Sequence, residues 1–181
     1  GVFSLDDALK LLSHRARLMQ ALLQDGAMSV VFANKEVVAQ AIEPYYREVS
    51  IAAINGPRNT VISGNQEAVT QLTTAFQHQQ IKVTPLTVSH AFHSPLMEPM
   101  LEKFAHIAAE ITYSRPNMAL VSNVTGDIIN DDVATPEYWV NHIRQPVQFA
   151  KGVQMLVEQG YRVYIELGPH PTLIGMGQQC V

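Results

Sequence analysis

The segment His90-Ala91-Phe92-His93-Ser94-Pro95 contains the residues of this sequence that are best suited to chemistry. It places two histidines three residues apart, an aromatic side chain beside the second, and a proline shortly after it. Histidine is the side chain most often used for proton transfer near neutral pH. We therefore interpret His93 as a candidate general base. An ordinary hydrogen-bonded loop histidine would show the same pattern, and the spacing alone does not separate these two interpretations.

A general base needs a nucleophile, and the sequence offers no obvious one. No Gly-x-Ser-x-Gly motif occurs in the 181 residues, and the single cysteine, Cys180, is the penultimate residue. A metal site built on His90 and His93 is also disfavoured, because no nearby Cys, Asp or second pair of histidines completes a ligand set. We therefore predict no metal. The pattern indicates part of an active site, and we expect a fragment or processed piece of a longer protein.

Two further side chains are candidates for binding or positioning. Arg15 lies on the first predicted helix, and a guanidinium can hold a carboxylate through two parallel hydrogen bonds. On the residues alone, a solvated helix face is the favoured interpretation of Arg15. His142 follows a predicted helix and could be structural. The segment 166–170, Glu-Leu-Gly-Pro-His, could form a wall near the mouth of an active site, although a structural turn is the simpler interpretation.

Composition excludes several classes of protein. A chain with 47% hydrophobic and 15% charged residues is typical of one soluble globular domain with a sizeable core. Its net charge of −4 and the lack of a basic stripe argue against a nucleic-acid partner. No apolar run reaches about 18 residues, so we expect no membrane span. One cysteine excludes an internal disulfide framework and is compatible with a reducing compartment.

Capping residues and hydrophobic spacing predict the elements that must position the candidate residues. Ser4 is a predicted helix N-cap, and apolar residues at helical spacing continue to Leu23 before Gly26 stops the helix. From 28 to 86 the predicted order is strand, helix, strand, strand, helix, strand, which is the order of a ferredoxin-like unit.

The remainder of the chain alternates between helix and strand. Helices are predicted over 94–111, from 136, over 147–159 and from 172 onward. Strands are predicted over 119–123 and 161–167, the latter with a buried-looking pattern. Alternation of this kind favours an α/β fold with a parallel sheet. We find no internal repeat and no low-complexity linker.

Taken together, these motifs resemble the malonyl-CoA:acyl-carrier-protein acyltransferase family, and most of all the acyltransferase domain of modular type I polyketide synthases. The resemblance extends over almost the whole chain and rests on several ordered blocks. The matching blocks are 1–8, 15–20, 53–57, 61–64, 90–94, 138–140, 146–149 and 166–171.

The resemblance implies an α/β fold, namely the C-terminal part of an α/β-hydrolase-like large subdomain with an inserted ferredoxin-like small subdomain. The expected division is 1–27 for part of the large subdomain, 28–86 for the small subdomain and 87–181 for the rest of the large one. The family's nucleophile, a serine in Gly-His-Ser-x-Gly, would lie just before the block that starts at Gly1. The chain would then be the C-terminal two-thirds of such a domain.

The resemblance also implies roles for individual residues. His93 would be the general base and acid that serves the serine. Arg15 would bind the free carboxylate of the extender unit. His142 falls where the family orients the catalytic histidine through a backbone carbonyl. Asn55 would face the pantetheine arm of the substrate.

The tetrapeptide that ends in His93 resembles the version associated with malonyl selectivity, whereas methylmalonyl-selective relatives tend to carry Tyr-Ala-Ser-His. Together with His90, Phe92 would line the extender-unit pocket and fill the space that a methyl group on the α-carbon needs. A methyl-sized contact changes binding by about 1–3 kcal/mol, so we expect selectivity from this feature to be finite.

The implied reaction is a ping-pong transfer of malonyl from malonyl-CoA to the serine and then to the phosphopantetheine thiol of an acyl carrier protein. No cofactor would be bound permanently. The expected partners are the acyl carrier protein and the ketosynthase and linker domains of the same synthase, in the cytoplasm. Two alternatives stay open. One is a non-catalytic remnant or docking module; the weaker one is a hydrolase of stalled acyl groups, which would gain little from Arg15. Without the serine, the 181 residues alone are expected to be inactive.

Overall fold

Polar capping residues begin the main helices of the computed structural model, which describes all residues from 1 to 181. Ser4 accepts a hydrogen bond from the backbone N–H of Asp7 (3.0 Å) and starts α1 (Leu5–Gln20). Asn34 caps α2 (Lys35–Ile42) and Asn65 caps α3 (Gln66–His78) in the same way. Each cap satisfies a backbone donor that would otherwise lack a partner, so the sequence fixes where these helices begin.

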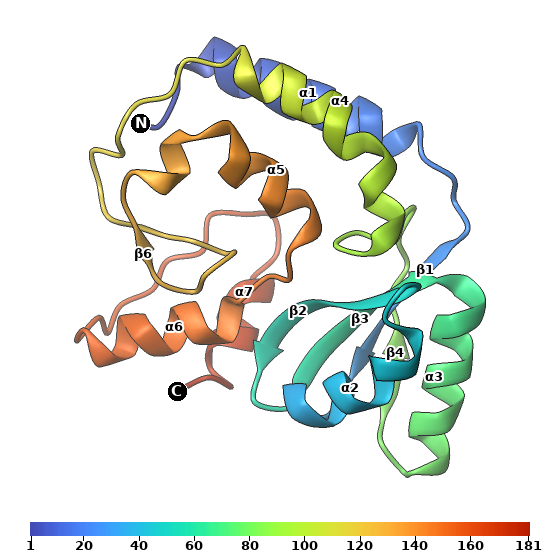
Figure 1. The fold of residues 1–181 in the computed structure, drawn as a ribbon. Helices are drawn as coiled ribbons and strands as arrows, with labels where there is room; N and C mark the ends of the chain where they lie inside the picture. The colour runs from blue at the N-terminus through green and yellow to red at the C-terminus, as the bar shows by residue number, and fades with distance from the viewer.

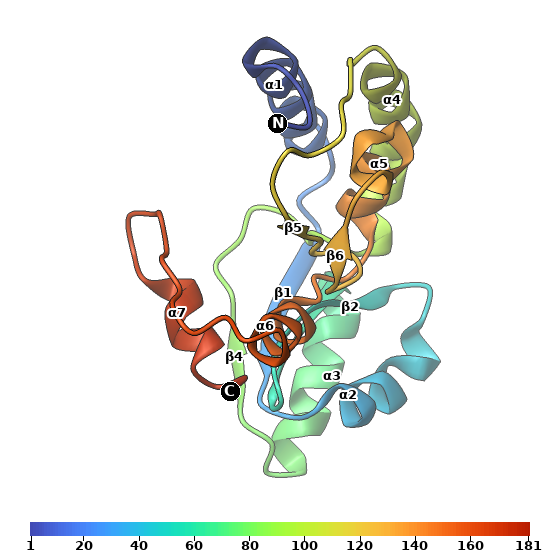
Figure 2. The same cartoon turned by 90° about the vertical axis from the view of Figure 1, so that its left-hand side faces the viewer.

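A four-stranded antiparallel sheet lies below the helices α1, α4 and α5 in Figure 1. Its order is β2-β3-β1-β4, and α2 and α3 lie together on one side of it (Figures 1 and 2). Two connections along the chain pass through helices, and β2 and β3 form a hairpin. This arrangement confirms the predicted ferredoxin-like β-α-β-β-α-β unit. The strands are β1 (Gly26–Val31), β2 (Val49–Gly56), β3 (Asn59–Asn65) and β4 (Val83–Pro85).

The alternation of side chains along β1 gives the sheet two different faces. Ala27 and Val31 pack toward α2 and α3, in a cluster that also contains Phe76. Met28 and Val30 point to the opposite face, in a smaller cluster with Ala52 and Val61. Successive residues of a strand point to opposite faces, so a one-residue change of register would exchange the two clusters.

A second apolar cluster holds three helices together. α1, α4 (Glu98–Ala109) and α5 (Pro136–Arg144) lie close to one another, away from the sheet's own helices (Figure 2). Their shared core contains Leu11, Phe104 and Ile143, together with Met97 from the short 3-10 helix η2 (Pro95–Met97). This cluster of three helices carries Arg15 on α1 and His142 on α5. The fold therefore brings together residues from the two ends of the chain.

The remaining elements are short. Val147 joins this part to the small sheet, because its N–H donates to Ala52 O and its carbonyl accepts from Ile54 N–H, both at 2.8 Å. This bridge to Ala53 is the one parallel pairing in the chain. The other elements are η1 (Glu43–Tyr45), β5 (Leu120–Val121), β6 (Ile128–Ile129), η3 (Asp132–Ala134), α6 (Phe149–Glu158) and α7 (Thr172–Gly177).

Three expectations were wrong. The parallel sheet is not formed, since every strand pair is antiparallel. The predicted strand over 161–167 has no hydrogen-bonded neighbour, and Val163, Ile165 and Leu167 are 81%, 81% and 95% exposed. An apolar, β-rich pattern becomes a strand only where a partner strand completes its hydrogen bonds. The first helix ends at Gln20, and Gly26 instead begins β1, where it pairs with Asn65.

None of the helices combines the length and the apolar composition needed to cross a lipid bilayer.

Candidate active site

His93 has a left-handed backbone conformation, with φ of 62°. This region is uncommon for any residue other than glycine, and it persists only where the surrounding structure enforces it. Ser94 contributes to that constraint, because its hydroxyl donates to Ala91 O (2.6 Å) and accepts from Leu96 N–H (3.2 Å). Pro95 then begins η2. The hydrogen bonds of Ser94 therefore link the residues before His93 to those after it.

Arg144 holds the same loop from outside. Its Nη1 donates to the carbonyl oxygen of His93 (3.2 Å) and its Nε donates to Glu98 Oε1 (3.0 Å). The ion pair with Glu98 is partly exposed, so its own contribution to stability is small, about 0–1 kcal/mol. Its effect is geometric, because it fixes the last turn of α5 against the start of α4 and the backbone of His93.

The surroundings of His93 favour its neutral form. Partial burial lowers the pKa of the imidazole, and the positive charges of Arg15 and Arg144 lower it further. The nearby backbone of Gln145 opposes this change. The Nδ1 atom is buried and has no hydrogen-bond partner. A neutral imidazole at neutral pH is the form that can accept a proton.

Arg15 reaches the same cluster from α1. Its Nη1 lies 3.3 Å from His142 Nδ1, and none of the ion pairs of the chain includes it. An apolar cavity of about 230 Å³ is lined by Arg15 and by side chains that include Phe104 and Trp139. Burial lowers the pKa of Arg15 from its high ordinary value, although a guanidinium remains charged at any physiological pH. A half-buried cation without an acidic partner is a suitable site for an anion.

Phe92 lies between the two halves of the structure. Its side chain packs against the helical cluster of α1, α4 and α5 and also against the small cluster around Met28. Its ring centroid is 6.2 Å from that of His90. The residue next to His93 is therefore part of the apolar contact between the sheet and the helices.

His90 has a structural environment. It is only 2% exposed, its Nε2 donates to Leu22 O (3.2 Å), and its Nδ1 lies 3.0 Å from Ser89 Oγ. These contacts fix the start of the loop to the chain between α1 and β1. No three His, Cys, Asp or Glu side chains come together in a way that could hold a metal ion.

Asn55 contacts the C-terminal end of the chain. It is on the edge strand β2, and its carbonyl oxygen is 3.4 Å from the Sγ of Cys180. No hydrogen bond or aromatic contact connects it with His93, Arg15 or His142. The structure therefore brings together Arg15, His93 and His142 and places Phe92 and His90 in the same loop as His93, whereas Asn55 has no direct contact with this cluster.

Sequence reasoning missed two contributors to the site. Arg144 and its partner Glu98 hold the loop of His93 and were not singled out. The one local signal was the position of Arg144 in the last turn of a helix, where a basic residue has an ordinary explanation in the helix dipole.

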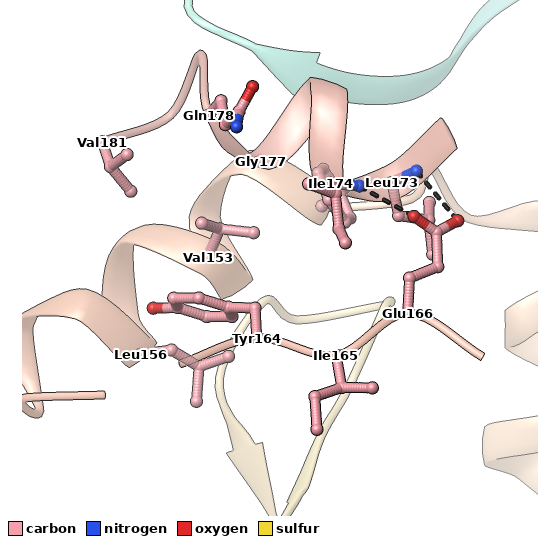
Figure 3. Close-up of a pocket in the computed structure, with 11 residues that line it drawn as sticks. Val153, Leu156, Tyr164, Ile165, Glu166, Leu173, Ile174, Gly177, Gln178 and Val181 are labelled. Carbon is pink, nitrogen blue, oxygen red and sulfur yellow. Dashed lines mark hydrogen bonds between the residues drawn. The ribbon is translucent and has the colours of Figure 1, made fainter. Parts of the chain in front are cut away.

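A second cavity, of about 380 Å³, lies between α6, α7 and the segment that connects them (Figure 3). Glu166 accepts backbone hydrogen bonds from Thr172, Leu173 and Ile174 at 3.0–3.1 Å, and these bonds lower the pKa of its carboxyl group. The carboxylate is thus used to start α7. None of the six candidates lines this cavity, so the larger cavity is separate from the histidine cluster.

Proteins of one family are similar to this chain over its whole length. The sequence profile of a family described as "acyl transferase domain" matches residues 1–181. A spectinabilin polyketide synthase system protein of Streptomyces orinoci is 41% identical over 182 residues, and a phenolphthiocerol synthesis type I polyketide synthase of Mycobacterium marinum is 46% identical over 181. They cover 100% and 99% of this chain, and the chain spans 8% of each relative.

Two solved structures are similar over the whole fold. The acyltransferase domain from the second module of the salinomycin polyketide synthase has a TM-score of 0.97 and 41% identity. It covers 100% of this chain, which spans 42% of that structure. The malonyl CoA-acyl carrier protein transacylase of Clostridium perfringens has a TM-score of 0.92 and 28% identity, covers 99% of this chain and is itself covered to 58%.

Proposed function

Because this chain belongs to the acyl transferase domain family, we propose that it forms part of a polyketide synthase acyltransferase that moves a malonyl unit from malonyl-CoA to an acyl carrier protein. One observation carries the proposal. A base-competent histidine, His93, and a half-buried guanidinium without an acidic partner, Arg15, lie on either side of the same residue, His142. A cluster of this composition can activate a nucleophile next to a bound carboxylate.

In the proposed reaction the His93 imidazole takes the proton of a serine hydroxyl while the serine oxygen attacks the thioester carbonyl of malonyl-CoA. The carbon–sulfur bond breaks, and the imidazolium gives its proton to the departing CoA thiolate. His93 then takes the proton of the thiol on the carrier protein's phosphopantetheine arm while the sulfur attacks the serine ester. The ester C–O bond breaks, and the imidazolium returns the proton to the serine oxygen. No Gly-x-Ser-x-Gly motif occurs among the 181 residues, so we assign the serine to residues outside them.

The supporting features have separate roles. Arg144 fixes the backbone of His93, and Arg15 pairs with the malonyl carboxylate. Phe92 restricts the space beside the α-carbon of the extender unit, and His90 anchors the loop that contains both. Asn55 is proposed only as part of the surface that faces the pantetheine arm. The division into 1–27, 28–86 and 87–181, the ketosynthase and linker partners and the cytoplasmic location belong to the same proposal.

The test uses His93→Ala in the full-length acyltransferase that contains this chain. We expect formation of the malonyl-serine adduct, followed by mass spectrometry with labelled malonyl-CoA, to fall about 10²- to 10⁴-fold. His78→Ala is the matched control, because His78 is exposed in the last turn of α3. Acylation of the His93→Ala enzyme at the rate of the control would refute the proposal.

A further inference from the structure

We infer that His142 is a positioning residue that orients the Arg15 guanidinium for the carboxylate of the acyl substrate. This inference rests on the proposed function, and it gives His142 a role different from the orientation of His93. The starting point is the hydrogen bond of 3.3 Å between Arg15 Nη1 and His142 Nδ1, which joins α1 to α5 across 127 residues of sequence.

The chemistry of the two side chains determines which one donates this hydrogen bond. A guanidinium can only donate hydrogen bonds, so the Nδ1 atom of His142 must be the acceptor. The imidazole proton must then lie on Nε2, and only this tautomer is compatible with the contact. His142 is the one side chain to which Arg15 is hydrogen-bonded, so the direction of the guanidinium plane depends on it.

The ring of His142 is itself held by aromatic neighbours. Its centroid lies 6.1 Å from that of Tyr138 and 6.2 Å from that of Trp139. These neighbours are anchored in turn, since the Tyr138 hydroxyl is 3.0 Å from Ser122 Oγ and Trp139 Nε1 donates to Val133 O (3.0 Å). A fixed acceptor limits the rotamers that a long arginine side chain can adopt, and pre-organisation of this kind favours binding.

The charge of the pair explains why a histidine suits this position. Burial, the charge of Arg15 and the neighbouring His93 lower the pKa of His142 to about 4, so its Nδ1 lone pair is available at neutral pH. A carboxylate at this place would also orient the arginine, but it would neutralise the positive charge that a substrate carboxylate needs. A neutral acceptor uses one of the five N–H donors of the guanidinium and leaves its charge unpaired.

His142→Phe in the full-length acyltransferase tests this inference, because phenylalanine keeps an aromatic ring among Tyr138 and Trp139 and removes the acceptor. We expect kcat/KM for malonyl-CoA to fall about tenfold, mostly through KM, and that for acetyl-CoA to fall by less than about threefold. His142→Gln carries an amide oxygen that can accept from Arg15, and it should restore most of the malonyl activity.

Two further variants keep the outcome interpretable. His142→Leu also lacks the acceptor and replaces His142→Phe if that protein does not fold. In an Arg15→Ala background, His142→Phe should not change the malonyl-to-acetyl ratio further, because the group that it positions is absent. Equal losses for malonyl and acetyl in both acceptor-free variants would overturn the inference and show a purely structural role.

The same measurements separate this inference from the proposed function. If Arg15→Ala lowers the malonyl-to-acetyl ratio and both acceptor-free variants leave it unchanged, the role of His142 is refuted and the proposed function stands. If Arg15→Ala leaves the ratio unchanged, the carboxylate site is elsewhere and both the role of Arg15 and that of His142 are refuted.

Discussion

The depressed pKa of His142 has a measurable consequence for stability. An imidazole in the unfolded chain has a pKa of 6.5, whereas burial and Arg15 lower that of the folded chain to about 4. Below pH 6.5 the unfolded state therefore binds more protons than the folded state, so acid favours unfolding. The contribution of this residue to stability is complete above pH 6.5 and is lost as the pH falls toward 4.

The size of the effect follows from these two pKa values. Each unit of difference corresponds to about 1.4 kcal/mol, and between pH 7 and pH 5 the linkage relation gives a loss of about 2 kcal/mol in the free energy of unfolding. His142→Gln cannot titrate in this range and keeps a hydrogen-bond acceptor for Arg15. We therefore expect the stability of the wild type to fall by about 2 kcal/mol more than that of the variant over this interval.

Urea unfolding at half-unit pH steps, followed by circular dichroism, measures the difference directly. Titrating groups that are distant from His142 are present in both proteins, and their contributions cancel in the comparison. Stability curves that stay parallel from pH 7 to pH 5 would show that His142 has an ordinary pKa in the folded protein. The argument for a permanently available Nδ1 acceptor would then fail.

Three other variants test separate parts of the structure. Phe92→Ser should increase the use of methylmalonyl-CoA relative to malonyl-CoA in competition assays, by an amount equivalent to about 1–3 kcal/mol, and an unchanged ratio in a folded variant would place the side chain outside the extender-unit pocket. Arg144→Gln should lower kcat about tenfold for malonyl and acetyl alike, because the backbone of His93 loses its hydrogen bond. Arg144→Lys should recover part of this loss, and an unaltered kcat in Arg144→Gln would contradict the positioning role of Arg144. Gly64→Ala should destabilise the chain by about 3 kcal/mol in urea titrations, because a Cβ there would overlap backbone atoms next to and within β2. A Cβ at Gly175 meets open space, so Gly175→Ala should be neutral or slightly stabilising. Similar effects at both glycines would refute the packing argument.

The ferredoxin-like unit could be predicted from sequence because its signals are local. Asn34 and Asn65 cap their helices, and apolar clusters cover both faces of β1, so short stretches of sequence specify these elements. The strand predicted over 161–167 is absent because its formation depends on non-local contacts. Its composition is typical of a strand, but pairing depends on a neighbour that no local pattern reveals.

The candidate site was predictable only in part. The proton-transfer chemistry of His93 follows from its residue type, but its left-handed backbone and the hydrogen bond from Arg144 depend on a contact across 51 residues. Arg15 and His142, which also pair, are separated by 127 residues of sequence. Such contacts are set by the packing of α1, α4 and α5, and nothing in the spacing of the two residues indicates that they meet.

The double packing of Phe92 has a consequence for the engineering of extender-unit choice. Its ring contacts the helical cluster on one side and the small cluster on the sheet on the other, so the side chain contributes to cohesion between the two parts. Transplanting a tetrapeptide with a smaller residue at this position would enlarge the proposed extender-unit pocket and also leave a void between the helical cluster and the sheet. Chimeric enzymes made in this way should lose turnover for every acyl group unless compensating substitutions refill the space around Met28 and Ala52.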